Sequence, residues 1–185
     1  MLDNRRGFGY DCVEFTKGID GMIILGIDPG LATLGYGVIE VENDKRRVIQ
    51  YGTLNTPAGQ PIPYRLQAIS RGMNQLMDIY HPDEVAFEEL FFSKNITTGM
   101  AVSMARGVAL VAVVERTPNL YEYTPMQIKQ AVTGYGGADK HQVQMMVKML
   151  LNMREIAKPD DAADALAVAL THANSMHAKH LFKIQ

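Results

Sequence analysis

Four acidic residues stand in this sequence where packing alone does not explain them. Asp28 ends one apolar run and Glu88 ends another. Asp161 and Asp164 lie at i and i+3, a spacing that puts both on one face of the first turns of a helix. Ligand sites form where the strands of an α/β sheet end, and a helix N-terminus can reach the same edge. The four carboxylates are therefore candidates for a single site.

The chemistry of such a site follows from its charge. Carboxylates brought together without basic partners repel one another, so either some bind protons or divalent cations neutralise them. Oxygen-only ligands suit the hard cations Mg²⁺ and Mn²⁺, whereas Zn²⁺ prefers histidine and cysteine. Two such ions about 4 Å apart activate a water and stabilise the leaving 3′-oxygen in phosphodiester hydrolysis. The acids thus point to metal-assisted cleavage of a phosphodiester.

Each acid also has an ordinary structural interpretation. An acid at a helix N-terminus usually caps the helix or balances its dipole, which is the interpretation we favour for Asp160. A strand-end aspartate before Pro-Gly, as at Asp28, is often a turn former. Glu88 and Glu89 are neighbours on one strand and point to opposite faces, so only one can belong to the site. Periodicity alone does not choose between them.

Composition narrows the class of protein. The chain has 185 residues, a formal charge of −2 and one cysteine, Cys12. This charge excludes a uniformly basic nucleic-acid coat but not a local basic face. A single cysteine forms no intramolecular disulfide, which suits a reducing compartment. The longest apolar stretch, 108–114, is far short of the roughly 20 residues that span a bilayer, and no secretory signal is visible. We expect a cytoplasmic protein without membrane association.

The elements that must position the acids are legible from residue 22 onward. A polar segment at 42–47 is typical of a hairpin turn between β-rich runs, and leucine, isoleucine and methionine recur at helical spacing up to Tyr80. The predicted strands cover 23–28, 35–41, 48–54, 84–88 and 120–123; the predicted helices cover 66–80, 95–115, 126–132, 139–153 and 159 or 160 to 174. Three strands in a meander, then alternating helix and strand, predict an α/β fold with a mixed five-stranded sheet flanked by helices.

The sequence predicts one domain, with an extension before it and a short tail after it. Residues 1–21 mix charged, glycine and aromatic residues without a period, which indicates a disordered extension or an artefact of an upstream start codon. Residues 22–175 form the predicted domain. Residues 176–185 form a short tail to which the sequence assigns no role.

A set of motifs resembles the RuvC family, the bacterial crossover-junction endodeoxyribonucleases. The resemblance runs from Met22 to about His172, in the family's order. A lone Asp-Pro-Gly is weak evidence, but the ordered set is specific. The motifs are Ile-Leu-Gly-Ile-Asp-Pro-Gly, Gly-Tyr-Gly-Val-Ile, Phe-Glu-Glu followed by Phe-Phe-Ser-Lys-Asn, Ala-Arg-Gly-Val, Gln-Ile-Lys-Gln-Ala-Val, Gly-Ala-Asp-Lys-His-Gln-Val and Asp-Ala-Ala-Asp-Ala-Leu-Ala.

The resemblance implies an RNase H-like nuclease that resolves Holliday (four-way) junctions during homologous recombination and repair. It places the catalytic, metal-binding acids on Asp28, Glu88, Asp161 and Asp164, and so selects Glu88 over Glu89. Some family members carry histidine at the position of Asp164, whereas this chain keeps a carboxylate. Our hypothesis is that Asp28 bridges two Mg²⁺ ions, with Mn²⁺ able to substitute, and that hydrolysis leaves 5′-phosphate and 3′-hydroxyl ends.

The resemblance also implies DNA contacts. Lys140 matches a family lysine beside the active site, and Lys129 matches another that contacts DNA. Lys94 and Arg106 are candidates for flanking phosphates, although a structural ion pair is an equal expectation for Lys94. Phe91 and Phe92 follow the catalytic strand, where an aromatic of the family reaches unpaired bases. The resemblance does not say which of the two it is; we expect Phe91 at the DNA and Phe92 in the core.

The histidines are not expected to be metal ligands, because their spacing does not suit one. We expect surface or helix-face positions for them; they are His141, His172, His177 and His180.

Partners follow from the same resemblance. Two symmetric nicks suit an isologous homodimer, and the small residues of helix 95–115 permit close helix approach at its interface. The branch-migration proteins RuvA and RuvB are further expected partners. Two other functions compete: an actin-like ATPase or sugar kinase, for which the chain lacks a second Asp-x-Gly hairpin, and a non-catalytic junction-binding protein, against which the four acids argue.

Overall fold

The computed structural model describes residues 21–43, 45–90 and 96–185, with side chains of the last range from residue 99 onward. The predicted extension at 1–21 therefore lies almost wholly outside these ranges. Within them, no helix is both long and apolar enough to cross a membrane. The elements in chain order are β1 (Met22–Asp28), β2 (Thr33–Glu42), β3 (Lys45–Asn55), α1 (Ile62–Tyr80), β4 (Glu84–Glu88), α2 (Ile96–Val114), β5 (Leu120–Tyr123), α3 (Pro125–Thr133), α4 (Lys140–Leu150), α5 (Asp160–Asn174) and the 3₁₀ helix η1 (Met176–Phe182).

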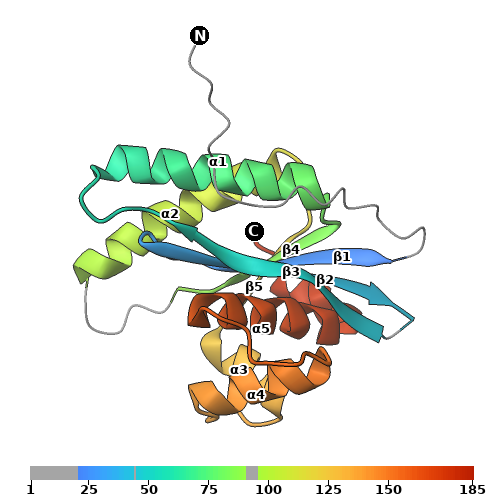
Figure 1. Cartoon of the computed structure of the whole chain (residues 1–185). Coiled ribbons are helices and arrows are strands. Elements are labelled where there is room, and N and C mark those ends of the chain that lie inside the picture. Colours follow the sequence, from blue (N-terminus) through green and yellow to red (C-terminus); the bar gives the residue numbers. More distant parts are fainter. Residues whose placement is uncertain (1–20, 44, 91–95) are drawn as a thin grey trace.

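The strands form one mixed sheet in the order β3-β2-β1-β4-β5. Strands β1, β2 and β3 pair antiparallel, whereas β4 is parallel to β1 and β5 is parallel to β4. Helices α1 and α2 cover one face of the sheet, α5 covers the other, and α3 and α4 pack beyond α5 (Figure 1). The predicted α/β fold with a mixed five-stranded sheet is confirmed.

Three places show the largest differences from the predicted boundaries. The hairpin turn is shorter than 42–47 because both strands continue into it. Helix α1 begins at Ile62 rather than residue 66, because Pro63 falls in the first turn, where a helix needs no donor from it. Helix α4 ends at Leu150 rather than residue 153, because Asn152 has a φ of 50°, in the left-handed region, which a helix does not continue.

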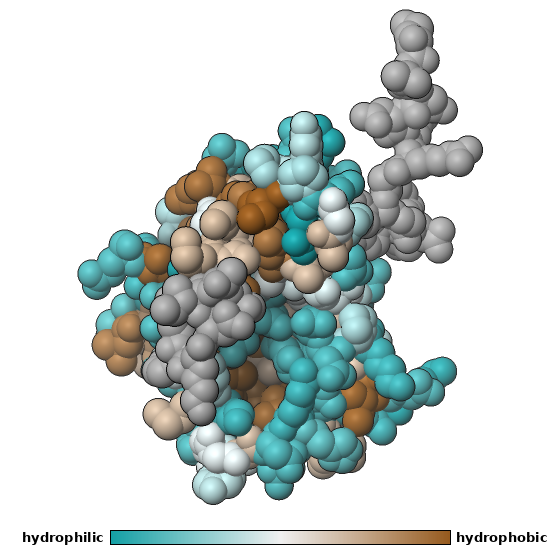
Figure 2. All heavy atoms as spheres, turned by 90° about the vertical axis from the view of Figure 1, so that its left-hand side faces the viewer, coloured by the Kyte–Doolittle hydropathy of each residue, from teal (hydrophilic) through white to brown (hydrophobic). Residues whose placement is uncertain are grey.

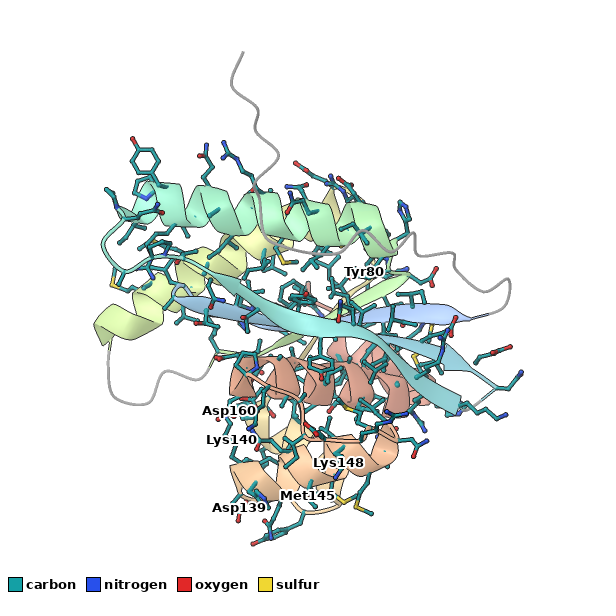
Figure 3. All side chains as sticks on the ribbon, in the orientation of Figure 1. Tyr80, Asp139, Lys140, Met145, Lys148 and Asp160 are labelled. Carbon is teal, nitrogen blue, oxygen red and sulfur yellow. The ribbon has the colours of Figure 1, made fainter. Side chains whose placement is uncertain are left out.

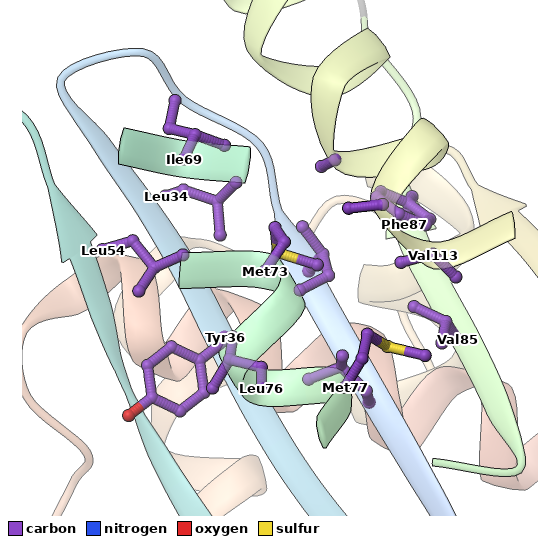
Figure 4. Close-up of a cluster of buried hydrophobic side chains, with 14 of the residues drawn as sticks. Leu34, Tyr36, Leu54, Ile69, Met73, Leu76, Met77, Val85, Phe87 and Val113 are labelled. Atoms are coloured by element: carbon purple, nitrogen blue, oxygen red, sulfur yellow. The ribbon is translucent and has the colours of Figure 1, made fainter. Parts of the chain in front are cut away.

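Strand alternation divides the buried side chains between the two faces. Ile23, Leu25 and Ile27 of β1 join the core under α1 and α2. Figure 4 shows this core, in which Met73 and Phe87 pack among aliphatic side chains. Residues at the alternate positions belong to the second core, under α5. An acid that ends β1 or β4 can therefore face either core, according to its parity.

Glycines let α5 lie directly on the sheet. A Cβ on Gly26 would come within 2.2 Å of the Ala165 carbonyl oxygen, and one on Gly37 within 2.8 Å of the Leu166 amide nitrogen. No side chain fits at either position, since real Cβ contacts do not fall below 3.0 Å. Because of these two glycines, the backbone of α5 lies directly against β1 and β2. The N-terminus of α5 thereby reaches the ends of these strands.

The C-terminal segment is part of the structure. Helix η1 packs against β5, and the Ile184 amide donates to the Leu120 carbonyl at 3.0 Å, so residues beyond η1 cover the edge of β5. Lys179 of η1 pairs with Glu84 at the start of β4. The segment to which the sequence assigned no role thus joins the end of the sheet opposite to Glu88.

Candidate active site

Asp28 and Glu88 lie on the same face because of strand parity. Ile27 pairs with Phe87 across the parallel strands β1 and β4. Both of these side chains join the core under α1 and α2, so the next residue of each strand points toward α5. Glu88 is thus the member of the Glu pair that shares a face and an edge with Asp28, as the resemblance implied.

Helix α5 brings the other two acids to this edge. Gly35 pairs with Asp28 in the antiparallel register of β1 and β2. A Cβ on Gly35 would lie 2.0 Å from the Asp161 carbonyl oxygen, so Asp161 sits directly over the residue beside Asp28. Asp164 follows at i+3 on the same helix and is close enough for its charge to act on both Asp28 and Glu88. The four predicted acids therefore converge.

Burial and repulsion make this cluster hard to ionise fully. Burial, followed by the charges of Glu88, Asp164 and Asp161, raises the pKa of Asp28 to about 8. Burial and the charge of Asp164 also raise the pKa of Glu88, although a hydrogen bond with Asp28 opposes this. The two side chains share a proton: protonated Asp28 donates to the Glu88 carboxylate. Burial likewise raises the pKa of Asp164. The cluster is short of positive charge.

Lys140 supplies one cation. The Asp139 carboxylate accepts from the Gln142 amide at 2.9 Å in a capping box, which makes Lys140 the first residue of α4. Its Nζ lies 3.0 Å from Asp164 Oδ2 and 3.3 Å from Asp160 Oδ2. Burial lowers the pKa of Lys140, but the bonds to Asp164 and Asp160 outweigh it, so the pKa is raised and the ammonium stays charged.

Asp160 belongs to this pairing rather than to a side-chain cap. It is the first residue of α5, with Pro159 at the N-cap and no capping hydrogen bond. Lys140 and the Gln144 amide, which donates to Asp160 at 3.2 Å, lower the pKa of Asp160. Figure 3 shows Lys140 and Asp160 side by side where α4 and α5 meet. Of the two roles expected for Asp160, the helix cap is wrong, because Pro159 holds the N-cap position; its place in the first turn of α5 suits the helix dipole. The sequence did not reveal its partners Lys140 and Gln144.

The other predicted DNA contacts divide into three cases. Lys129 lies on α3, whose start is fixed by the Thr124 capping box, and its charge lowers the pKa of Glu88, so it is near the site. Arg106 lies on α2 and pairs with Glu122 of β5 at 2.5 Å. Phe91, Phe92 and Lys94 lie outside the described residues.

The expectation for the histidines is wrong for His172. Its side chain is fully buried, with Nε2 2.6 Å from Glu84 Oε2 and Nδ1 2.7 Å from the Tyr123 hydroxyl. We expect a surface or helix-face position for this histidine, and the structure places it on the buried face of α5; the sequence does not show that Glu84 lies beneath it. Within the described residues, no three histidine, cysteine or acidic side chains are drawn together tightly enough to hold a metal ion as they stand.

Figure 2 shows the face on which the strand ends lie. Hydrophilic residues cover much of its lower half, and hydrophobic residues gather in its upper part, at the height of α1 and α2. The polar surface is the one that a charged ligand would meet.

The family model for crossover junction endodeoxyribonuclease RuvC matches residues 24–172. The chain belongs to the RuvC family. The matched range spans β1 to α5 and includes all four acids of the cluster and Lys140. RuvC of Alkaliphilus metalliredigens is 54% identical over 164 residues, which cover 89% of this chain and all of that one. RuvC of Brevibacillus brevis is 54% identical over 152 residues, covering 82% of this chain and 92% of that one.

Solved structures give the same picture. The structure of Thermus thermophilus RuvC with a Holliday junction substrate has a TM-score of 0.79 at 38% identity, and covers 84% of this chain and 94% of that one. The yeast mitochondrial Holliday junction resolvase Ydc2, at 16% identity, has a TM-score of 0.63 and covers 88% of this chain and 85% of that one. The second likeness concerns the fold alone.

Two residues of this RuvC-family site escaped sequence reasoning. Gly35 seats Asp161, and Gln144 holds Asp160 beside Lys140. The spacing of Lys140 and Gln144, one helical turn apart, was a usable signal for the second. The role of Gly35 could not be predicted without knowing that α5 crosses β2.

Proposed function

We propose that this chain is a structure-selective endonuclease that cuts four-way DNA junctions by hydrolysing phosphodiester bonds. The observation that carries the proposal is the convergence of Asp28, Glu88, Asp161 and Asp164 at one sheet edge, with Lys140 on Asp164. The family shares this activity by name, and the Thermus relative was solved with a Holliday junction. A phosphate backbone fits a site that offers lysines beside cation-binding acids.

We further propose Mg²⁺ as the cofactor, two ions per site, with Mn²⁺ able to substitute. The donor set fits: every candidate ligand is a carboxylate, and the cluster is so short of positive charge that Asp28 keeps a proton up to a pH of about 8. Asp28, Glu88, Asp161 and Asp164 would hold the ions. When bound, such ions activate a water and stabilise the departing oxygen. The four half-buried acids themselves orient the site.

Lys140 and Lys129 are the proposed phosphate contacts. The Lys140 ammonium is charged and half-exposed, so it can reach a phosphate oxygen while it remains beside Asp164. Lys129 adds a second positive charge on the side of Glu88. Arg106 remains a proposed contact with a flanking phosphate, although it must share its guanidinium with Glu122. Phe91 and Lys94 remain proposals from the resemblance.

We propose a homodimer through helix α2. Met100, Met104, Val111 and Val114 are all exposed, and space is open above Gly107 between them. Their spacing of four, three, four and three residues forms one apolar stripe along the helix. A stripe of this kind exposed to water is typical of an interface. A second copy would cover it and give one cutting site per strand of a symmetric junction.

We also propose RuvA and RuvB as partners, on the family resemblance. We propose that the chain acts in the cytoplasm, which the single cysteine supports. A non-catalytic junction-binding protein is the competing function. Against it stands the acid cluster, because unpaired burial of carboxylates destabilises a protein that makes no use of them.

The test is cleavage of a labelled four-way junction beside linear duplex with the same arms, with Mg²⁺ and with EDTA. We expect paired symmetric nicks, in the junction alone and only with Mg²⁺. Asp28→Asn should abolish the nicks and retain junction binding. Binding without cutting by the wild type would favour the non-catalytic function, and equal cutting of duplex would contradict junction selectivity.

A further inference from the structure

A chain of buried hydrogen bonds lies at the far end of α5 from the acids. Glu84 at the start of β4 bonds to His172 near the end of α5, which bonds in turn to Tyr123 of β5. All three side chains are almost fully buried. Lys179 of η1 also contacts Glu84, and the Tyr121 hydroxyl lies 3.4 Å from it. The chain links α5 to two strands and to the C-terminal segment.

The direction of the bonds follows from the donors available. Burial raises the pKa of the Tyr123 hydroxyl, which stays protonated 2.7 Å from His172 Nδ1. The Glu84 carboxylate can only accept, so the other ring nitrogen, Nε2, donates to it. Burial favours protonation of Glu84, but the His172 and Lys179 bonds outweigh it and lower the pKa. The His172–Glu84 bond is therefore charge-assisted and directional.

The separation of Glu84 and Glu88 along β4 matches that of Asp164 and His172 along α5. Glu84 and Glu88 lie on one face of β4, four residues or about 13 Å apart at strand rise. Asp164 and His172 lie on one face of α5, eight residues or about 12 Å apart at helical rise. A helix that places His172 over Glu84 consequently places Asp164 near Glu88.

The contacts of α5 with the sheet are mostly apolar. Six of its eleven buried residues are alanine, and Leu166, Val168 and Leu170 are the larger apolar ones. The close approach at Gly26 and Gly37 sets how near the helix lies to the sheet. The His172–Glu84 bond adds to these apolar contacts a directional one between buried groups of α5 and β4.

Resting on the proposed nuclease function, we propose that His172 is a positioning residue: its bond to Glu84 sets where α5 lies along β4, and so the separation of Asp164 and Glu88. The imidazole touches neither substrate nor metal. It acts through the helix, and Lys179 reinforces it by holding the acceptor carboxylate.

Two amide variants separate positioning from simple burial. His172→Gln keeps a donor near the position of Nε2 and can still reach Glu84, whereas His172→Asn keeps a partner for Tyr123 but falls short of Glu84. With Asn we expect cleavage to slow about 10- to 100-fold, the range for lost outer-shell support, with junction affinity retained. Mn²⁺ binding without DNA, followed by calorimetry, should weaken about tenfold in the same variant. Gln should stay close to wild type in both measurements.

Met73→Ala is the matched control, since it opens the core on the opposite face of the sheet without touching α5. It should lower the melting temperature without weakening Mn²⁺ binding. Equal losses for the Gln and Asn variants, in proportion to melting temperature as in the control, would overturn the proposal. So would Mn²⁺ binding at wild-type strength by His172→Asn.

A second route covers a variant that does not fold. Glu84→Asp keeps the charge but withdraws the carboxylate by one methylene, and should reproduce the His172→Asn losses; wild-type behaviour would overturn the proposal. The Mn²⁺ titration also separates the two claims. If the wild type binds Mn²⁺ but cuts no junction, the nuclease function fails, while the comparison of variants still decides the positioning role.

Discussion

Strand β4 carries a glutamate at each end, on the same face and under the same helix, and its surroundings treat the two charges in opposite ways. At Glu84, His172 and Lys179 hold the pKa of the carboxyl below its usual range. At Glu88, burial and the charge of Asp164 raise the pKa. One end is a satisfied ionic network and the other is an unsatisfied cluster.

The difference shows where stability and function reside in this fold. Glu84 is nearly inaccessible and has its partners within the chain. Glu88 and Asp28 share a proton because the chain supplies too few cations for them. An acid whose partners must come from outside the protein marks a binding site, whereas an acid with partners inside marks architecture.

The largest expected difference between the two ends of β4 is in cleavage, when each glutamate is replaced by glutamine. Glu88→Gln should reduce junction cleavage by about 10³-fold or more, because a neutral amide cannot replace a charged ligand in the transition state. Glu84→Gln should lose far less, since its amide oxygen still accepts from His172. Single-turnover cleavage of a labelled junction at saturating enzyme measures both. Comparable losses would show that the two ends are not functionally distinct.

Removing Lys140, the lysine beside the acidic cluster, should give the next largest loss of cleavage. Lys140→Met should slow cleavage by about 10²-fold, since it removes a charged donor beside the reacting phosphate. It should also make binding less sensitive to salt, by about one unit of the slope of log affinity against log salt. Lys45→Met, on the hairpin at the opposite end of β2, is the control and should change neither slope nor rate. A Lys140 variant that cuts at the wild-type rate would remove this residue from the site.

The acidic cluster could largely be predicted from the sequence, whereas the hydrogen-bond network at Glu84 could not. Asp28 was predictable, because apolar runs that end in an acid mark strand ends, but the same pattern left Glu88 and Glu89 open until the family resemblance selected Glu88. The spacing of Asp161 and Asp164 marks a helix face. The network at Glu84 was not predictable, because its partner His172 lies 88 residues away and no local pattern connects them. Local periodicity encodes elements, whereas pairing across the sheet depends on how α5 crosses it.

Stability against pH should differ in sign between the two ends in metal-free protein. Asp28 has a folded-state pKa raised to about 8 from 3.8, so its contribution is present at low pH and is lost as pH rises toward 8. Asp28→Asn should therefore raise the melting temperature at pH 8 in EDTA by roughly 3–6 °C, if relief of repulsion is worth about 1.5 kcal/mol. A lower melting temperature would contradict the repulsion that we infer.

The melting temperature measured against pH also tests Glu84, at acidic pH. Its folded-state pKa is lowered from 4.5, so its contribution is present above that pH and is lost as pH falls below it. In Glu84→Gln the acid limb of the melting curve below pH 4.5 should flatten. An unchanged acid limb would mean that Glu84 is not the group responsible.

The smallest effect belongs to Lys179. Its side chain is 35% exposed, so solvent screens its pairing with Glu84. Lys179→Met should cost about 0.5–1 kcal/mol of unfolding free energy, with cleavage close to wild type. Denaturant unfolding measures the loss, and 1 M salt should remove most of the difference between the two proteins. A large loss of cleavage would move Lys179 from a supporting role to an essential one.

The distance along the chain between Glu84 and His172 bears on the order of folding. Their bond closes a loop of 88 residues, whereas the meander of β1, β2 and β3 is built from neighbours in sequence. Contacts between near neighbours form sooner, because closing a long loop costs more chain entropy. We therefore expect the meander to form before α5 docks. The like charges of the site then meet only when the rest of the sheet is already in place to hold them.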